Sequence, residues 1–512
     1  MALLKQERID PSPVIADEVK KTTCYMCACR CGIRVYLRNG EVRYIEGNPD
    51  HPVNRGVLCG KGSSGIMQHL SPARLSNPLK RVGPRGSGEF EEISWEEALE
   101  TAVKWLGDIR SSDPRKLAFF TGRDQSQSLT AYWATQFGTP NHAAHGGFCS
   151  VNMAAAGLYT IGGSFWEFGE PDWERTRYFM MFGVAEDHDS NPIKTGLGHL
   201  KGRENTKFVS INPVRTGYSA IADEWIPIKP GTDGALFLAL GNEIIKQGLY
   251  DRDFLVQYSN AAELVNMDPN SSEYGMFVRF EVPLEEGCFD PQNKLWWDRE
   301  LNKPISTHTP GADPYLLGEF RLDDGTPVKP AFQLLVDRVK QYSAEWAAEI
   351  TGIPVATIKR LAHEMGITAR DERIELPIPW TDAWGNDHES VTGNPVAFHA
   401  MRGLAAHSNG FQTIRAMSIL MSILGTIDRP GGFRHKPPFP RPIPPCAKTP
   451  TGPDDVQPDT PLNGMPLGWP ADPDDLFVDA QGEPVRIDKA LSWEYPLSVH
   501  GLMHNAITNA WR

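Results

Sequence analysis

The chain has 512 residues, of which 40% are hydrophobic and 22% charged. This length leaves room for about three domains, and the composition is that of a globular protein and not of a disordered chain. The net charge is 51 − 64 = −13, without any run of basic residues, which argues against nucleic acid or anionic lipid as a partner.

No stretch of about 18 or more apolar residues occurs in the sequence, so we predict no direct membrane span. The first twenty residues lack the basic and apolar regions of an export signal and contain no pair of arginines. We therefore expect a cytoplasmic protein. Eight cysteines are too few for a disulfide scaffold in so long a chain, and half of them lie between residues 24 and 31. This clustering indicates a metal site.

Four cysteines have the spacing of an iron–sulfur site. Three form a C-x2-C-x3-C motif, and the fourth follows a predicted β-hairpin with an Asn39-Gly40 turn; they are Cys24, Cys27, Cys31 and Cys59. A zinc ribbon, the alternative, needs a second pair of cysteines, whereas a lone distant cysteine completes a [4Fe–4S] set. We therefore favour the cluster. A fifth cysteine, Cys29, is expected to point away from it.

This motif and the segments that follow it resemble the N-terminus of the molybdopterin-dependent oxidoreductases, which include formate dehydrogenases, nitrate reductases and polysulfide reductases. The matching segments are 24–62, 71–75, 78–83 and 93–98, and the resemblance continues to about residue 433. It implies a molybdenum or tungsten bis(molybdopterin guanine dinucleotide) beside the [4Fe–4S] cluster. It also implies that Lys61, between cluster and pterin, contacts the cofactor and helps electrons to pass.

From about residue 115 to 235, strand and helix patterns alternate, which predicts a doubly wound α/β domain. Buried strands are expected at 116–120, 178–182 and 207–211. The predicted fold class is α/β, in which a small β-rich [4Fe–4S] domain precedes interleaved, doubly wound pterin-binding domains. The boundaries that we predict are 18–75 for the cluster domain, 76–140 with 365–512 for one discontinuous α/β domain, and 141–364 for a second that binds a pterin guanine dinucleotide. The family's C-terminal pterin-clamping domain is expected to be absent.

A single cysteine between the first two strands, Cys149, matches the family position that coordinates the metal. A soft thiolate at the start of a helix suits molybdenum or tungsten. The resemblance implies that Cys149, His145 and Lys61 are the catalytic residues. Arg123, His145 and Arg402 are equal candidates to hold an anionic substrate. Formate dehydrogenases of the family carry His directly after the metal cysteine, whereas this chain has Ser150, which disfavours formate.

The nucleotide-binding signal in this chain is not one of the common motifs. Neither G-x-G-x-x-G nor a Walker A sequence occurs. The resemblance implies instead that segments 212–216, 222–223 and 229–233 bind the guanine dinucleotide, and a helix beginning after Gly231 would offer free N–H groups to phosphate. The predicted cofactor contacts are Asn212, Arg215, Asp223, Gly231, Asp233, Asn409 and Gln412.

Three further segments carry weaker signals. Residues 250–330 are expected to form an irregular insertion with a hairpin, and the segment from 407 to a Pro-Gly-Gly stop at 430–432 an amphipathic helix. The proline-rich stretch at 437–473 is expected to be extended.

Strings at 145–152 and 183–192 resemble the sulfite dehydrogenase branch of the family. The resemblance implies a molybdenum enzyme that oxidises a small anionic substrate, sulfite, to sulfate. Electrons would leave through the [4Fe–4S] cluster to a ferredoxin-like iron–sulfur subunit, and a membrane anchor subunit would attach the complex to the cytoplasmic face of the inner membrane. The alternatives are a formate dehydrogenase, a thiosulfate or polysulfide reductase, or a non-catalytic electron-transfer subunit.

Overall fold

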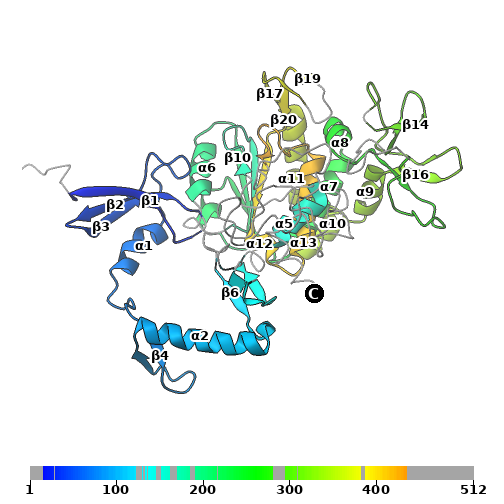
Figure 1. The fold of residues 1–512 in the computed structure, drawn as a ribbon. Helices are drawn as coiled ribbons and strands as arrows, with labels where there is room; N and C mark the ends of the chain where they lie inside the picture. The colour runs from blue at the N-terminus through cyan, green and yellow to red at the C-terminus, as the bar shows by residue number, and fades with distance from the viewer. Residues whose placement is uncertain are drawn as a thin grey trace, which may run out of the picture. The chain divides into compact units, whose positions relative to one another are not determined.

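The computed structural model describes residues 15–434 with internal gaps. The gaps are residues 28, 123–129, 131–132, 135, 146–150, 162–169, 185–190, 216, 281–293, 308 and 382–386. The chain divides into two compact units (Figure 1), which are Met1–Ala143 with Glu186–Gly198, and Ala144–Ala185 with His199–Arg512.

The first unit begins with a three-stranded antiparallel sheet in the order β1-β2-β3. Its strands are β1 (Glu18–Thr23), β2 (Gly32–Arg38) and β3 (Glu41–Gly47). The predicted hairpin is confirmed, because Asn39 and Gly40 have φ values of 54° and 80°, the positive φ pair of a type I′ turn. Helix α1 (Gly60–His69) packs against β3.

A buried asparagine joins the two ends of this small domain. Asn54 is 0% exposed. Its Oδ1 accepts a hydrogen bond from the Gly32 N–H at 2.9 Å, and its Nδ2 donates to the carbonyls of Gly32 at 3.0 Å and Val57 at 2.9 Å. Gly32 follows Cys31, and Val57 lies two residues before Cys59. One side chain therefore holds the two cysteine-bearing segments together.

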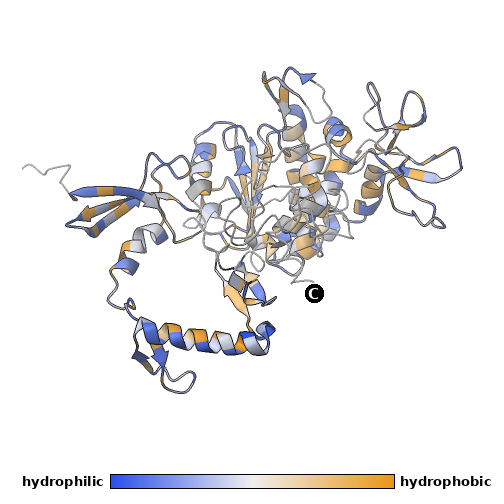
Figure 2. Cartoon of the chain, viewed as in Figure 1, coloured by the Kyte–Doolittle hydropathy of each residue, from blue (hydrophilic) through white to orange (hydrophobic). Residues whose placement is uncertain are grey.

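The rest of the first unit contains a long amphipathic helix, α2 (Trp95–Ser112), capped by Ser94, whose side chain accepts from the Glu97 N–H at 3.1 Å. Blue and orange bands alternate along α2 in Figure 2, and within the described part of the chain the helix buries none of its residues. The other elements are β4 (Leu79–Arg81), β5 (Phe90–Glu92), η1 (Pro114–Lys116), β6 (Phe119–Thr121) and β7 (His142–Ala144).

The strand predicted at 116–120 is only partly correct. Lys116 ends the 3-10 turn η1, and β6 pairs with β7 in a two-stranded sheet instead of joining a large parallel one. The physical reason is burial, since a strand inside a parallel sheet is covered on both faces, whereas Phe120 is exposed.

The second unit is built on a four-stranded parallel sheet in the order β11-β10-β9-β21. Its strands are β9 (Tyr178–Phe182), β10 (Lys207–Ile211), β11 (Glu224–Ile226) and β21 (Val396–Ala400). The strands predicted at 178–182 and 207–211 are confirmed with their boundaries. All five residues of β9 are buried, as expected of a parallel strand covered on both faces.

Apolar packing covers both faces of this sheet. On one face, Phe182 meets Phe237 of helix α7 with ring centroids 4.7 Å apart. On the other, Phe179 lies 5.4 Å from Phe208 and 5.1 Å from Trp173. The helices that pack around α7 (Asp233–Lys246) are α9 (Ala331–Val339), α10 (Ala344–Thr351), α11 (Val355–Asp371) and α13 (Gly410–Ile423). The helix predicted between residue 407 and the Pro-Gly-Gly stop is confirmed as α13, which begins at Gly410 and already ends at Ile423.

Smaller elements complete the second unit. The expected hairpin within 250–330 is β13 (Leu295–Asp298) with β14 (Lys303–Ser306). The others are α5 (Val151–Ile161), β8 (Glu170–Pro171), η2 (Gly217–Ala220), α8 (Arg252–Tyr258), β12 (Leu264–Asn266), β15 (Phe320–Arg321), β16 (Pro327–Pro330), β17 (Ile374–Leu376), β18 (Trp380–Thr381), β19 (Asp387–His388), β20 (Val391–Gly393), α12 (Arg402–Ala405) and β22 (Phe433–Arg434). Helix α6 (Asn191–Lys201) belongs to the first unit up to Gly198 and to the second from His199.

The parallel sheet draws on both of the α/β domains that we predicted, because β21 falls in the range 365–512 and the other three strands in 141–364. The exact boundaries stay a prediction. The proline-rich stretch at 437–473 lies outside the described residues. None of the helices that the structure describes has the length and apolar character of a membrane span.

Asn54→Ala tests the clamp between the two cysteine-bearing segments. The substitution leaves the buried N–H of Gly32 without its acceptor, so we expect it to destabilise the small domain by about 1–3 kcal/mol. Hydrogen exchange of the β2 amides measures this as a loss of protection of about tenfold or more. Asn77→Ala, at an exposed asparagine of the same unit, is the matched control. Equal exchange in the two variants would contradict a clamping role.

Candidate cluster site and cofactor-binding edge

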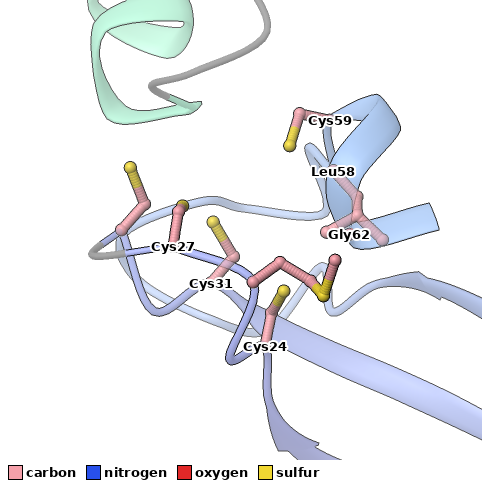
Figure 3. A pocket seen from close by; sticks show the side chains of 8 residues that line it. Cys24, Cys27, Cys31, Leu58, Cys59 and Gly62 are labelled. Carbon is pink, nitrogen blue, oxygen red and sulfur yellow. The ribbon is translucent and has the colours of Figure 1, made fainter. Parts of the chain in front are cut away.

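The five cysteines of residues 24–59 line one hollow of about 270 Å³, which includes space open to solvent (Figure 3). The other residues that line it, Met26, Leu58 and Gly62, are apolar. Three of the thiols are buried and two are half-buried; in that order they are Cys24, Cys31 and Cys59, then Cys27 and Cys29. Sulfur ligands thus surround an apolar space, which suits an iron–sulfur cluster.

Backbone contacts hold the buried thiols in place. The Cys24 N–H donates to the Cys31 carbonyl at 2.8 Å and closes the loop between β1 and β2. Within it, Arg30 adopts a left-handed φ of 48°, and its guanidinium lies 4.5 Å above the Tyr25 ring. Cys59 is the N-cap of α1, so the positive end of that helix dipole lies beside the negative charge of a bound cluster.

The donor set fits a [4Fe–4S] cluster. Such clusters take four thiolates, and the predicted ligands Cys24, Cys27, Cys31 and Cys59 all line the hollow. Among the described residues, no three Cys, His, Asp or Glu side chains converge closely enough to hold a single metal ion. The expectation that Cys29 points away is wrong, because Cys29 lines the same hollow. The chain turns at Arg30, so spacing along the sequence does not fix the direction of this side chain.

Lys61 is the second residue of α1 and lies two residues after Cys59. It is half-buried. Its carbonyl accepts a hydrogen bond from the Ser64 hydroxyl at 2.9 Å. The position beside the cluster ligand is as expected, and the role of Lys61 in electron passage stays a prediction.

A second group of predicted residues lies at the carboxyl edge of the parallel sheet. Asn212 directly follows β10 and is 4% exposed. Its N–H donates to the Ile226 carbonyl at 3.2 Å, and its own carbonyl accepts from Trp225 Nε1 at 2.9 Å. Its Nδ2 is buried and has no hydrogen-bond partner among the described residues. Because an unpaired buried donor is costly, this amide is suited to a ligand that accepts its hydrogen bond.

The N-termini of two long helices meet at this edge. Asn409, the N-cap of α13, donates from Nδ2 to the Gly231 carbonyl at 2.9 Å, and a Cβ on Gly231 would lie 3.4 Å from His407 Nδ1. Neither Asn409 nor Thr232, the N-cap of α7, uses its side chain to cap its own helix. The first N–H groups and dipoles of both helices therefore suit a phosphate group.

Asp233, the first residue of α7, is a buried carboxyl group, 5% exposed. Burial raises its pKa to about 6, against the opposing effects of a backbone hydrogen bond and of nearby His407. Once ionised, the carboxylate can accept hydrogen bonds from the N–H edge of a base such as guanine.

The helix that follows the candidate metal ligand packs against the same region. Cys149 lies outside the described residues, and α5 begins two residues after it. Asn152 in the first turn of α5 donates from Nδ2 to the Ala405 carbonyl at 2.7 Å, two residues before His407. His145, also predicted to be catalytic, follows β7 and is half-buried.

Of the other predicted residues, one lies at the other end of the sheet and two are exposed. Asp223 lies at the opposite, amino-terminal end of β10, where its carboxylate accepts from the Phe208 N–H at 2.8 Å and pairs with Lys201. Arg215 is exposed. Gln412 is exposed on α13 and accepts from Arg415 Nη1 at 3.2 Å.

Sequence reasoning missed two contributors. Asn54 belongs to no sequence motif. Its hydrogen bonds to Gly32 and Val57 depend on two segments that only the fold brings together. Asn152 lies on α5, three residues after the candidate metal ligand Cys149, and its place in the first turn of that predicted helix was the available signal.

Comparison with protein families matches two parts of the chain. Residues 17–70 match the molybdopterin oxidoreductase Fe4S4 domain, and residues 74–459 match the molybdopterin oxidoreductase model. The first match confirms the [4Fe–4S] prediction over the zinc ribbon. The second covers more than half of the chain and includes the sheet edge that carries Asn212, Gly231 and Asp233.

Individual relatives differ in their sequence identity to this chain and in the length that they match. The A subunit of sulfite dehydrogenase from Allochromatium vinosum is 69% identical over 497 residues, which are 97% of this chain and 51% of that protein. The molybdopterin-containing subunit of thiosulfate reductase from Salmonella typhimurium is 32% identical over 246 residues, which are 47% of this chain and 31% of the relative. The chain thus spans about half the length of the first of these relatives and matches a smaller share of the second.

Among solved structures, acetylene hydratase from Pelobacter acetylenicus matches with a TM-score of 0.55 at 21% identity, over 81% of this chain and 44% of that one. At this identity the likeness concerns the fold alone. It confirms the predicted α/β class, with the small cluster domain ahead of the pterin-binding region. The two family matches carry the assignment, and the chain belongs to the molybdopterin oxidoreductase family, with that family's Fe4S4 domain at its N-terminus.

Proposed function

We propose that this chain belongs to the catalytic subunit of an enzyme that oxidises sulfite to sulfate. The observation that carries the proposal is the 69% identity, over 97% of the chain, to the A subunit of a sulfite dehydrogenase. The reaction consumes sulfite and water and yields sulfate, two protons and two electrons. Cys24, Cys27, Cys31 and Cys59 would hold the [4Fe–4S] cluster, which would supply one-electron transfer.

The cofactor proposed is a molybdenum or tungsten bis(molybdopterin guanine dinucleotide), whose metal supplies two-electron redox chemistry when bound. Three features of the sheet edge support a guanine dinucleotide there. Asn212 offers an unpaired amide donor, Asp233 a buried carboxyl group for the base, and the starts of α7 and α13 free N–H groups for phosphate. Asn409 positions Gly231 between the two helices.

Residues 145–149 are proposed to act on the substrate side. Cys149 would be the protein ligand of the metal, as a soft thiolate, and His145 would hold the anion. Lys61, beside Cys59 in the chain, would assist electron passage toward the cluster. Arg215 and Gln412 stay proposed cofactor contacts, whereas Asp223 is less favoured because it lies at the other end of β10.

The partners proposed are a ferredoxin-like iron–sulfur subunit that accepts the electrons and a subunit that anchors the complex at the cytoplasmic face of the inner membrane. The Allochromatium vinosum relative is itself one subunit of its enzyme, which supports an assembly of several chains. A thiosulfate reductase is the second candidate, supported by the 32% identity to a thiosulfate reductase subunit.

Metal analysis and substrate assays on the anaerobically purified full-length protein test the proposal. We expect about four irons and one molybdenum or tungsten per chain, and reduction of an artificial acceptor by sulfite but not by formate. Iron without molybdenum or tungsten would indicate a non-catalytic electron-transfer subunit. Reduction of thiosulfate without oxidation of sulfite would favour the second candidate.

Cys149→Ala tests the metal ligand. Because the variant removes the only proposed protein thiolate at the metal, we expect sulfite oxidation to fall by about 100-fold or more, while the iron content stays at that of the native protein. Cys288→Ala is the matched control, at a cysteine to which we assign no role. Native activity in Cys149→Ala would show that Cys149 is not a ligand of the metal.

Asp233→Asn tests the buried carboxyl group in cofactor-free protein. With a folded-state pKa of about 6 against 3.8, the folded state retains its proton longer than the unfolded state. Stability therefore falls as the pH rises from about 4 to 6, by an amount on the order of 3 kcal/mol. We expect the variant to be more stable than the native chain above pH 6 and equally stable below pH 4.

Urea unfolding at pH 4 and pH 7 measures this difference, with the exposed Asp323→Asn as the control. In cofactor-loaded protein the same variant is expected to lose guanine dinucleotide during gel filtration. An Asp233→Asn variant that matches the control at both pH values and retains the dinucleotide would contradict the assignment.

A further inference from the structure

We propose that Cys29 is a reserve ligand of the [4Fe–4S] cluster, which replaces Cys27 at the same iron when that ligand is lost. The inference rests on the proposed function only in that a cluster occupies the hollow. A cube of four irons takes four thiolates, whereas five cysteines line this hollow. One thiol is therefore in excess at the site.

Burial separates the fixed ligands from the exchangeable one. Cys24, Cys31 and Cys59 are buried. Cys24 and Cys31 are tied to each other by the 2.8 Å backbone hydrogen bond, and Cys59 is fixed at the start of α1. Cys27 and Cys29 are both half-buried and lie between the two tied cysteines. The fourth corner of the cluster is therefore the one at which a change of ligand disturbs the least packing.

Cys29 is within reach of that corner. Its Cα lies two residues from that of Cys27, at most about 7 Å along an extended chain, and its side chain already lines the hollow and packs against the apolar cluster of Cys24, Cys31 and Ile33. Cys31 is also two residues from Cys29, but its position is buried and its carbonyl is bonded to Cys24. The exchange is therefore specific to Cys27.

The exchange balances without an oxidant or reductant. The bond between Cys27 Sγ and iron breaks and one between Cys29 Sγ and iron forms, while the thiol proton of Cys29 passes to Cys27. In a Cys27→Ala variant the same proton goes to solvent. The cluster keeps four thiolates and its charge in both cases.

Four variants of the full-length, anaerobically purified protein test this: Cys27→Ala, Cys29→Ala, the Cys27→Ala/Cys29→Ala double variant, and Cys31→Ala as the control at the same separation from Cys29. Iron and sulfide content and the EPR spectrum of the reduced cluster are measured. We expect about four irons in the native chain and in each of the first two single variants, and loss of the cubane in the double variant and in Cys31→Ala.

Alkylation by iodoacetamide, mapped by peptide mass spectrometry, gives an independent readout. We expect Cys29 to react about tenfold more slowly in Cys27→Ala than in the native protein, because bonding to iron protects a thiolate. Cys27→Val, whose side chain cannot bind iron, repeats both measurements if the alanine variant fails to fold.

Two results would overturn the inference. One is a Cys27 variant that is folded by circular dichroism and as poor in iron as the double variant. The other is unchanged reactivity of Cys29 in a Cys27 variant that retains its cluster. Failure of the proposed function is distinct from both, because it appears as a native chain without a cluster.

Discussion

Parallel pairing of strands buried on both faces is the constraint on which the second unit depends. A strand such as β9, with all five residues buried, has no side chain left for a ligand along its length. Polar groups can serve chemistry only where the strands end, and parallel pairing brings those ends to one edge. Asn212 at the end of β10 and the starts of α7 and α13 meet there because the chain must turn from strand to helix at that level.

The cluster site of the first unit is formed in a different way, by hydrogen bonds that join the ends of loops. The antiparallel hairpin of β1 and β2 brings Cys24 and Cys31 together, and Asn54 links the residue after Cys31 to the segment before Cys59. Backbone contacts thus hold Cys24 and Cys31, and the start of α1 holds Cys59. That leaves the sulfur atoms directed at a common space, which a cluster, unlike a single ion, can fill.

Structural features that depend only on neighbouring residues are predicted correctly from the sequence. β9 and β10 are continuous apolar runs with clear ends, so their boundaries follow from the sequence, as does the Asn39-Gly40 turn. Asp223 shows where such reasoning fails, because pairing with β10 places it at the amino-terminal end and engages its carboxylate with Lys201. Nothing near Asp223 in the sequence indicates that register. The prediction of the Cys29 side-chain direction is wrong for the same reason, because this direction depends on the fold of the loop.

The sheet edge also shows how a binding site lowers the stability of the protein that holds it. An unpaired amide at Asn212 and a buried carboxyl group at Asp233 both oppose folding in the absence of a ligand. Their polarities are opposite, a donor and an acceptor, and a guanine dinucleotide offers both an acceptor and N–H donors. Binding would therefore offset the cost of both the unpaired amide and the buried carboxyl group. Cofactor affinity and the stability of the second unit are thus expected to change together.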